Sequence, residues 1–122
     1  MLSDIKSYRD LMVWQKSIRL VKDVYQITRS FPKEELFSIV SQMKKSAVSI
    51  PSNIAEGYGR NSRSDYIRFL KIAVGSLYEL QTQMEISKEL HFISEKDLAQ
   101  TLAIGVEIEK MLVVLIRKLE KH

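Results

Sequence analysis

The sequence contains no cysteine among its 122 residues. That absence excludes a disulfide framework, thiolate metal sites and a cysteine nucleophile. It is also typical of a reducing compartment, and no apolar signal core follows the first residues. We therefore expect a cytoplasmic protein.

Long apolar runs are missing as well. The longest, Met111 to Ile116, has six residues, whereas a membrane-spanning helix needs about 20. We expect no membrane partner. The length suits one domain, and a hydrophobic content of 45% is ordinary for a globular protein. The sequence thus predicts a single domain over residues 1–122, with residues 1–10 as a short lead-in.

Glycine and proline are scarce, with four and two copies. Their positions divide the chain into four stretches with helical periodicity, at residues 11–30, 34–56, 64–90 and 95–122. Short connections make consecutive helices antiparallel neighbours. We therefore predict an all-α protein, an antiparallel up-down-up-down four-helix bundle.

The third stretch has the most regular apolar seam, with alternating four- and three-residue steps: Tyr66, Leu70, Ala73, Leu77, Leu80 and Met84. Gly75 lies within it, and we expect this glycine to permit close approach of a neighbouring helix. In the second stretch, Pro51 predicts either a kinked helix or two shorter helices. Gly57 is expected to end that stretch.

Residues that could carry catalysis or hold a metal are few. The two histidines, His91 and His122, lack the Glu-x-x-His spacing of di-iron bundles, and both are interpreted as surface residues. The sequence has no Gly-x-Ser-x-Gly elbow, and Gly57 and Gly59 lack the spacing of a phosphate-binding loop. We expect a protein that is not an enzyme and binds no cofactor.

Charge is unevenly distributed. Residues 1–78 contain 13 Lys or Arg and seven Asp or Glu, whereas residues 79–122 contain six and eight. Residues 1–78 therefore have a net charge of +6 and residues 79–122 a net charge of −2, which sum to the +4 of the chain. Such asymmetry favours an anionic partner or self-association between unlike faces, although an ordinary solvated surface would also produce it.

Basic residues gather around the expected connection between the second and third helices: Lys44, Lys45, Arg60, Arg63, Arg68 and Lys71. Arg68 and Lys71 lie 60° apart on a helix and share a face. Tyr58 lies within the group and could stack on a base, while the cations neutralise phosphates. The pattern allows a nucleic-acid site or a solvated charged face, and it matches no known recognition module.

Several segments together resemble the four-helix-bundle proteins related to the 23S rRNA intervening-sequence proteins. The likeness covers nearly the whole chain. The segments that carry it are Val13-Trp14-Gln15-Lys16, Ser41-Gln42-Met43, the run from Ser49 to Arg60, Arg68-Phe69-Leu70 and Gly75-Ser76-Leu77.

The resemblance implies a four-helix bundle that assembles into a ring-like homopentamer, but no settled activity. A related group, the accessory variability proteins of diversity-generating retroelements, binds nucleic acid and a reverse transcriptase through a basic pentameric surface. The leading hypothesis is accordingly an oligomeric bundle that binds structured RNA, DNA or another polyanion through the six cations and Tyr58. The alternative is a protein-interaction scaffold without a nucleic-acid role.

Overall fold

Four long helices form the computed structural model, which describes residues 4–121. They are α1 (Met12–Thr28), α2 (Ile39–Tyr58), α3 (Arg63–Glu89) and α4 (Glu95–Glu120). Short 3-10 helices precede α1, at Tyr8–Asp10, and α2, at Lys33–Glu35. The predicted all-α, four-helix architecture is confirmed, and no strand occurs in the described residues.

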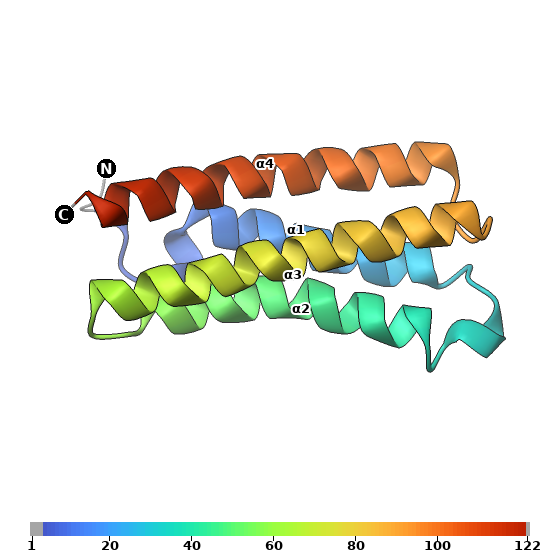
Figure 1. The fold of residues 1–122 in the computed structure, drawn as a ribbon, viewed down its shortest axis with the longest axis horizontal. Helices are drawn as coiled ribbons and strands as arrows, with labels where there is room; N and C mark the ends of the chain where they lie inside the picture. Colours follow the sequence, from blue (N-terminus) through green and yellow to red (C-terminus); the bar gives the residue numbers. More distant parts are fainter. Residues whose placement is uncertain (1–3, 122) are drawn as a thin grey trace.

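The helices pack side by side as a bundle, with α1 against α2 and α4, and α3 against the same two helices (Figure 1). In the α2–α3 pair, Ser87 bonds to Met43 and Ser76 to Ser49. Residue numbers therefore rise along one helix as they fall along the other, so the pair is antiparallel. One end of the bundle carries the α2–α3 connection, and the other carries the α1–α2 and α3–α4 connections (Figure 1).

The core lies along the bundle axis and is built from the apolar seams that the periodicity predicted. All but one of the six seam positions in α3 are fully buried, and Tyr66 packs against the core from its edge. Ile50, Ile54, Ile108 and Leu112 face them from α2 and α4 with no exposed surface.

Serine side chains cap the N-terminal ends of α3 and α4. Ser62 accepts a hydrogen bond from the backbone N–H of Asp65, and Ser94 accepts one from Asp97, each at 3.1 Å. These bonds satisfy N–H groups that the first helical turn leaves without partners. The start of α2 differs from the prediction. Residues 33–35 form a 3-10 turn, so α2 begins at Ile39, five residues later than predicted.

Pro51 does not divide the second helix, because α2 runs without interruption from Ile39 to Tyr58. Around it, the Asn53 side-chain amide donates to the Ser49 carbonyl at 2.7 Å and to the Ser49 hydroxyl at 2.9 Å. The Ser49 hydroxyl also bonds to that of Ser76 at 2.8 Å. A polar link therefore joins α2 to α3 beside the proline, and the alternative of two shorter helices is wrong.

Two glycine predictions are wrong. Gly57 does not end α2 but lies buried in its last turn, and Gly59 caps the helix. Gly75 has no atom within 4 Å of the position that a Cβ would occupy, so it permits no close approach. That role belongs to Gly57, against α3, and to Gly105, against Gln81 and Leu77.

The lead-in is structured from Asp4 onward. Ser7 and Asp10 form a capping box around the first 3-10 turn. The Tyr8 ring packs edge-on against Trp14, with 5.2 Å between ring centroids. These contacts join the lead-in to α1.

Candidate nucleic-acid interface

The connection between α2 and α3 positions the arginines that the sequence singled out. Gly59 donates its N–H to the carbonyls of Ala55 and Glu56, each at 3.2 Å, and Arg60 donates to Gly57 at 3.1 Å. A Cβ on Gly57 would lie 2.8 Å from Cβ of Phe69. The two helices therefore meet closely at this end, which brings Arg60 next to the first turns of α3.

Arg60 and Arg68 share one aromatic ring. Their Cζ atoms lie 4.7 Å and 4.6 Å from the centroid of Phe69, which is only 8% exposed. Guanidinium groups are attracted to the face of an aromatic ring, and this contact restrains their long side chains. The ring therefore restrains two positive charges at this end of the bundle.

Carboxylates partly neutralise this group. Arg60 pairs with Glu56 at 2.7 Å, and Arg68 pairs with Asp65 at 3.7 Å. Arg63, by contrast, is exposed and forms no ion pair with any residue from 4 to 121. Of the predicted arginines, Arg63 is the one whose charge is free of a carboxylate partner within the described chain.

Tyr58 is half-buried beside the arginines. Its ring meets that of Tyr66 edge-on, with 6.2 Å between centroids. Burial raises the pKa of Tyr66 from 10.0 to about 12, with a smaller contribution from Tyr58. Since one side of Tyr58 already packs on a neighbour, only the remaining part of its ring is available for stacking.

Lys44 and Lys45 do not lie in the cluster, so the prediction of one six-residue group is wrong for this pair. Met43, their neighbour, contacts Ser87 near the far end of α3. At 1.5 Å per residue, Lys45 is about 20 Å along α2 from Tyr58. Lys44 instead places its ammonium 4.6 Å from the ring centroid of Tyr25 on α1.

Lys71 connects the cluster to cations that sequence reasoning did not include. It pairs with Glu120 at 3.5 Å, which places the C-terminal end of α4 beside the start of α3. That end carries Arg117, Lys118 and Lys121. The antiparallel order of the predicted helices is the signal that could have joined these three cations to the cluster.

The two ends of the bundle therefore differ in charge. We define the basic end as residues 56–71 and 117–121, which contain seven Lys or Arg and three Asp or Glu, a balance of +4. The opposite end, residues 29–38 and 85–97, contains four and six, a balance of −2. The lead-in from Asp4 to Asp10 lies at the basic end and adds two charges of each sign.

Neither a metal site nor a membrane span is present in the described part of the chain. Among residues 4–121, no three His, Cys, Asp or Glu side chains are grouped so that they could hold a metal ion. None of the described helices combines the length and the apolar character that crossing a bilayer requires. His91 is exposed at the α3–α4 turn with φ of 64°, and His122 lies outside the described residues.

Comparison with known proteins identifies a matching family and a solved structure of similar fold. A family model described as 23S rRNA-intervening sequence protein matches residues 9–114. A crystal structure of a protein with unknown function from the S23 ribosomal protein family of Bacteroides thetaiotaomicron is 25% identical, with a TM-score of 0.80. That match covers 86% of this chain and 95% of the other. No protein with a curated description matches the chain.

Proposed function

This chain belongs to the 23S rRNA-intervening sequence protein family, and from that premise we propose that it is a non-enzymatic, homopentameric RNA-binding protein. The observation that carries the proposal is the charge difference between the two ends of the bundle. Phosphate contacts from Lys and Arg supply most of the affinity of proteins for nucleic acids. The basic end is the RNA-binding surface, and an RNA ligand implies a cytoplasmic location.

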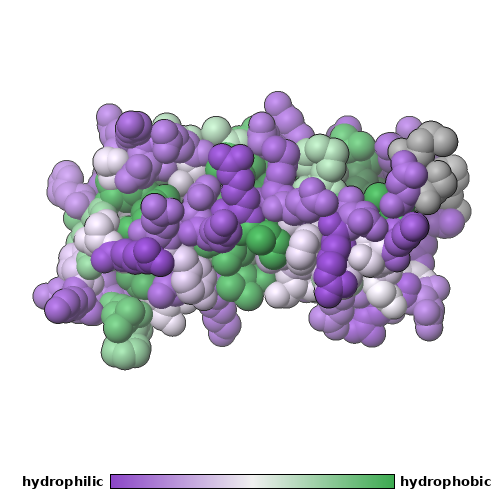
Figure 2. Space-filling model, turned by 180° about the vertical axis from the view of Figure 1, so that it is seen from behind, coloured by the Kyte–Doolittle hydropathy of each residue, from purple (hydrophilic) through white to green (hydrophobic). Residues whose placement is uncertain are grey.

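Self-association is supported by an apolar groove between α1 and α2. It has a volume of about 300 Å³ and is lined by Tyr8, Trp14, Ile18, Val21, Val48, Pro51, Ser52 and Ala55. Ile18 and Val48 are 36% and 40% exposed, and nearby Tyr25 is 41% exposed. Figure 2 shows apolar residues gathered in the middle of this side of the molecule. Contiguous exposed apolar surface marks interaction sites, and a second subunit would cover it.

A ring strengthens the electrostatic argument. Rotation about a single axis relates the subunits of a cyclic oligomer, so equivalent surfaces lie at one height on the ring. Five basic ends of +4 would together present about +20 on one rim. The modest net charge of a single chain is therefore compatible with strong attraction for RNA. The number of subunits rests on the family resemblance, and a light-scattering mass near 71 kDa, five times 14.2 kDa, tests it.

RNA binding is tested by fluorescence anisotropy with a structured rRNA fragment and a duplex DNA over a salt series. The test variant replaces three cations of the basic end with alanine: Arg63, Arg117 and Lys121. The matched control replaces three at the opposite end: Arg29, Lys33 and Lys96. All six side chains are exposed and lack an ion pair within the described residues, so both variants remove equal charge without breaking a salt bridge.

We expect the test variant alone to weaken RNA binding and to flatten its salt dependence. For duplex DNA, the log–log slope should change by about 0.9 for each phosphate that the variant no longer neutralises. Equal weakening by the control would show that net charge, rather than the basic end, governs binding. No binding by the wild-type protein at low salt would overturn the proposed function.

A second candidate function, a protein-interaction scaffold, is favoured by one feature. Phe37 is 91% exposed, and the adjacent Leu36 is 47% exposed, in the connection before α2. Two other phenylalanines do not extend this surface, because Phe69 is buried beneath arginines and Phe92 packs on Phe31 with 5.6 Å between centroids. A Phe37→Ser variant that loses a protein partner, with binding insensitive to salt and nuclease, would support this candidate.

A further inference from the structure

A polar groove lies between the second half of α1 and the first half of α4. Its volume is about 660 Å³, within the range of small-molecule sites. The ion pair between Lys16 and Glu107, at 3.0 Å, joins the two helices near the groove end that faces the basic end. The groove is lined by Arg19, Asp23, Gln26, Ile27, Ser30, Asp97, Gln100, Thr101, Ala103 and Ile104.

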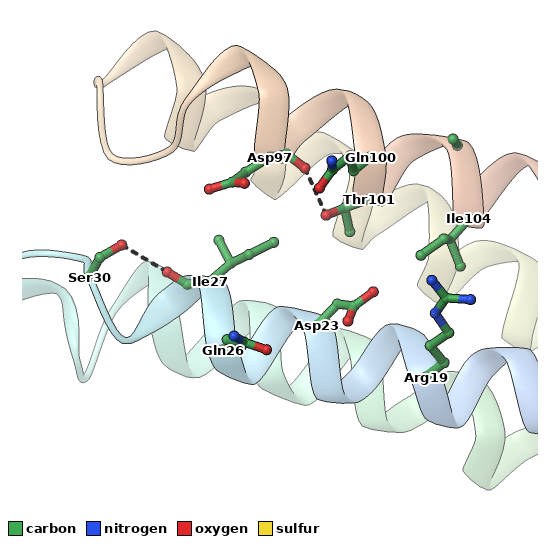
Figure 3. Close-up of a pocket in the computed structure, with 10 residues that line it drawn as sticks. Arg19, Asp23, Gln26, Ile27, Ser30, Asp97, Gln100, Thr101 and Ile104 are labelled. Atoms are coloured by element: carbon green, nitrogen blue, oxygen red, sulfur yellow. Dashed lines mark hydrogen bonds between the residues drawn. The ribbon is translucent and has the colours of Figure 1, made fainter.

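Three charged groups line this groove, Arg19 and Asp23 from α1 and Asp97 from α4. Arg19 and Asp23 both rise from α1 toward α4 (Figure 3). They lie one helical turn apart, about 6 Å, which allows an ion pair. Neither side chain forms an ion pair or a hydrogen bond with any residue of the described chain. At the basic end, the same spacing gives a 2.7 Å pair between Glu56 and Arg60.

The groove therefore offers a five-donor guanidinium beside a carboxylate that only accepts hydrogen bonds. Asp23 is half-buried between the helices, and Arg19 is exposed. Because neither charge is engaged by another described side chain, both are available to a ligand that accepts from Arg19 and donates to Asp23.

The walls suit a flat ring. Ile27 and Ile104 are half-buried and line the groove from opposite helices (Figure 3). Thr101 is 3% exposed and donates its hydroxyl hydrogen to the Asp97 carbonyl at 2.8 Å. Its hydroxyl oxygen therefore faces the groove only as an acceptor. Aliphatic walls around a few fixed polar groups are typical of sites for heterocycles.

We propose that this groove binds an unpaired guanine base of the RNA. Guanine presents two acceptors, O6 and N7, on one edge, and these match the donors of Arg19. Its adjacent N1–H and amino group donate, and they match the two oxygens of Asp23. Adenine carries an amino donor where guanine has O6 and an acceptor at N1. Adenine would therefore place a donor against the donors of Arg19 and an acceptor against the acceptors of Asp23.

Between this site and the basic end, beyond the Lys16–Glu107 ion pair, the same two helices form another groove. A second groove, of about 430 Å³, is lined by the first residues of α1 and by Lys110, Met111, Val114, Leu115 and Lys118 of α4. Lys110 and Lys118 form no ion pair within residues 4–121, and Met12 between the helices is 64% exposed. Single strands bind where cations follow the phosphates and apolar side chains contact the bases. The inference rests on the proposed function and adds base preference to it.

The first experiment titrates guanosine 5′-monophosphate and adenosine 5′-monophosphate into the isotope-labelled protein and follows backbone amide shifts by NMR. Guanosine monophosphate should shift amides of residues 19–27 and 97–104, with an affinity about tenfold above that of adenosine monophosphate. Equal affinities, or shifts only at the basic end, would overturn the inference. Because amide shifts are resolved residue by residue, this readout separates binding in the groove from phosphate binding at the basic end.

The second experiment compares single-stranded RNAs of equal length that differ only in containing guanine, inosine or adenine. Inosine lacks the amino group and should bind between the other two. Asp23→Ala should remove the preference for guanine and leave the salt slope unchanged. Glu79→Ala, an equal charge change at an exposed position of α3, should keep both. RNA binding without base preference would overturn the guanine site alone, and absence of RNA binding would overturn the proposed function.

Discussion

Gly57 and Phe69 pack so closely that a Cβ on the glycine would lie 2.8 Å from Cβ of the phenylalanine. Tyr66 limits the same space, with its Cδ1 at 3.1 Å and its carbonyl oxygen at 3.3 Å. These neighbours include backbone and the first atom of a side chain, which cannot move without displacing α3. This contact therefore sets both the separation of α2 and α3 and the position of the ring that carries Arg60 and Arg68.

Gly57→Ala should destabilise the protein by about 1–3 kcal/mol, the usual cost of overpacking a core. Urea unfolding followed by circular dichroism would measure the change. The matched control is Gly75→Ala. Its methyl group meets open space in a helix interior, so stability should rise by about 0.5–1 kcal/mol. Similar effects of the two changes would refute the steric argument.

Gln83 supplies a second stability test. The residue is 6% exposed, and its side-chain oxygen has no hydrogen-bond donor among the described residues. A buried polar atom without a partner costs about 1–3 kcal/mol. Gln83→Met keeps an unbranched side chain and removes that atom, so the free energy of unfolding should rise by about 1 kcal/mol. A fall on chemical denaturation would show that the oxygen is satisfied in solution.

Much of this fold could be predicted from sequence because the residues that a helix buries recur at regular spacing along the chain. The seam from Leu70 to Met84 is regular, and its positions are buried. Glycine roles could not be predicted, since they depend on what lies across the interface. Gly75 and Gly57 each lie in an amphipathic helix, yet one faces open space and the other faces Phe69.

The candidate site could be predicted only in part, for a related reason. Arg60, Arg63 and Arg68 are close in sequence and therefore in space. The basic residues at the end of α4 are nearly 50 residues further along the chain. The Lys71–Glu120 pair that brings them near appears only once the helices are packed. Conversely, Lys44 and Lys45 were predicted to join the cluster because they share a helix with Tyr58. A helix separates residues along its axis, so they lie far from the α2–α3 connection.

Tyr66 predicts a pH dependence of stability above pH 10. Its pKa is about 12 in the folded protein and 10.0 when unperturbed, with burial as the main cause. The native state therefore keeps this proton more tightly than the unfolded state does. The contribution of this raised pKa to the free energy of unfolding is fully present below pH 10 and is lost as the pH rises through 12. Partial solvent exposure reduces the full effect of two pKa units to roughly 1 kcal/mol.

Tyr66→Phe removes the titrating group while keeping the ring. Urea unfolding at pH 9, 10 and 11 would compare the two proteins, so that deprotonation of other residues cancels in the difference. The stability of the wild type relative to the variant should fall as the pH rises above 10. A constant difference across this range would contradict the raised pKa.

The carboxylates of the basic end give the last prediction, because they reduce its charge without contributing much stability. Glu56 and Glu120 pair with Arg60 and Lys71 while remaining 54% and 48% exposed. Exposed ion pairs of this kind contribute about 0–1 kcal/mol each. The double variant Glu56→Gln and Glu120→Gln should lose little stability and free two cations for phosphates. RNA affinity should rise, and the salt slope should steepen by up to about 0.7 per additional single-strand phosphate.

The matched control removes two carboxylates at the opposite end, Glu34→Gln and Glu85→Gln, neither of which forms an ion pair within the described residues. Both double variants raise the net charge of the chain from +4 by the same amount. Fluorescence anisotropy on the same RNA compares them at several salt concentrations. Because screening limits exposed charges to a range of about 10 Å at 0.1 M salt, the control should change the affinity little. A control that strengthens binding as much as the test variant would place the RNA somewhere other than the basic end.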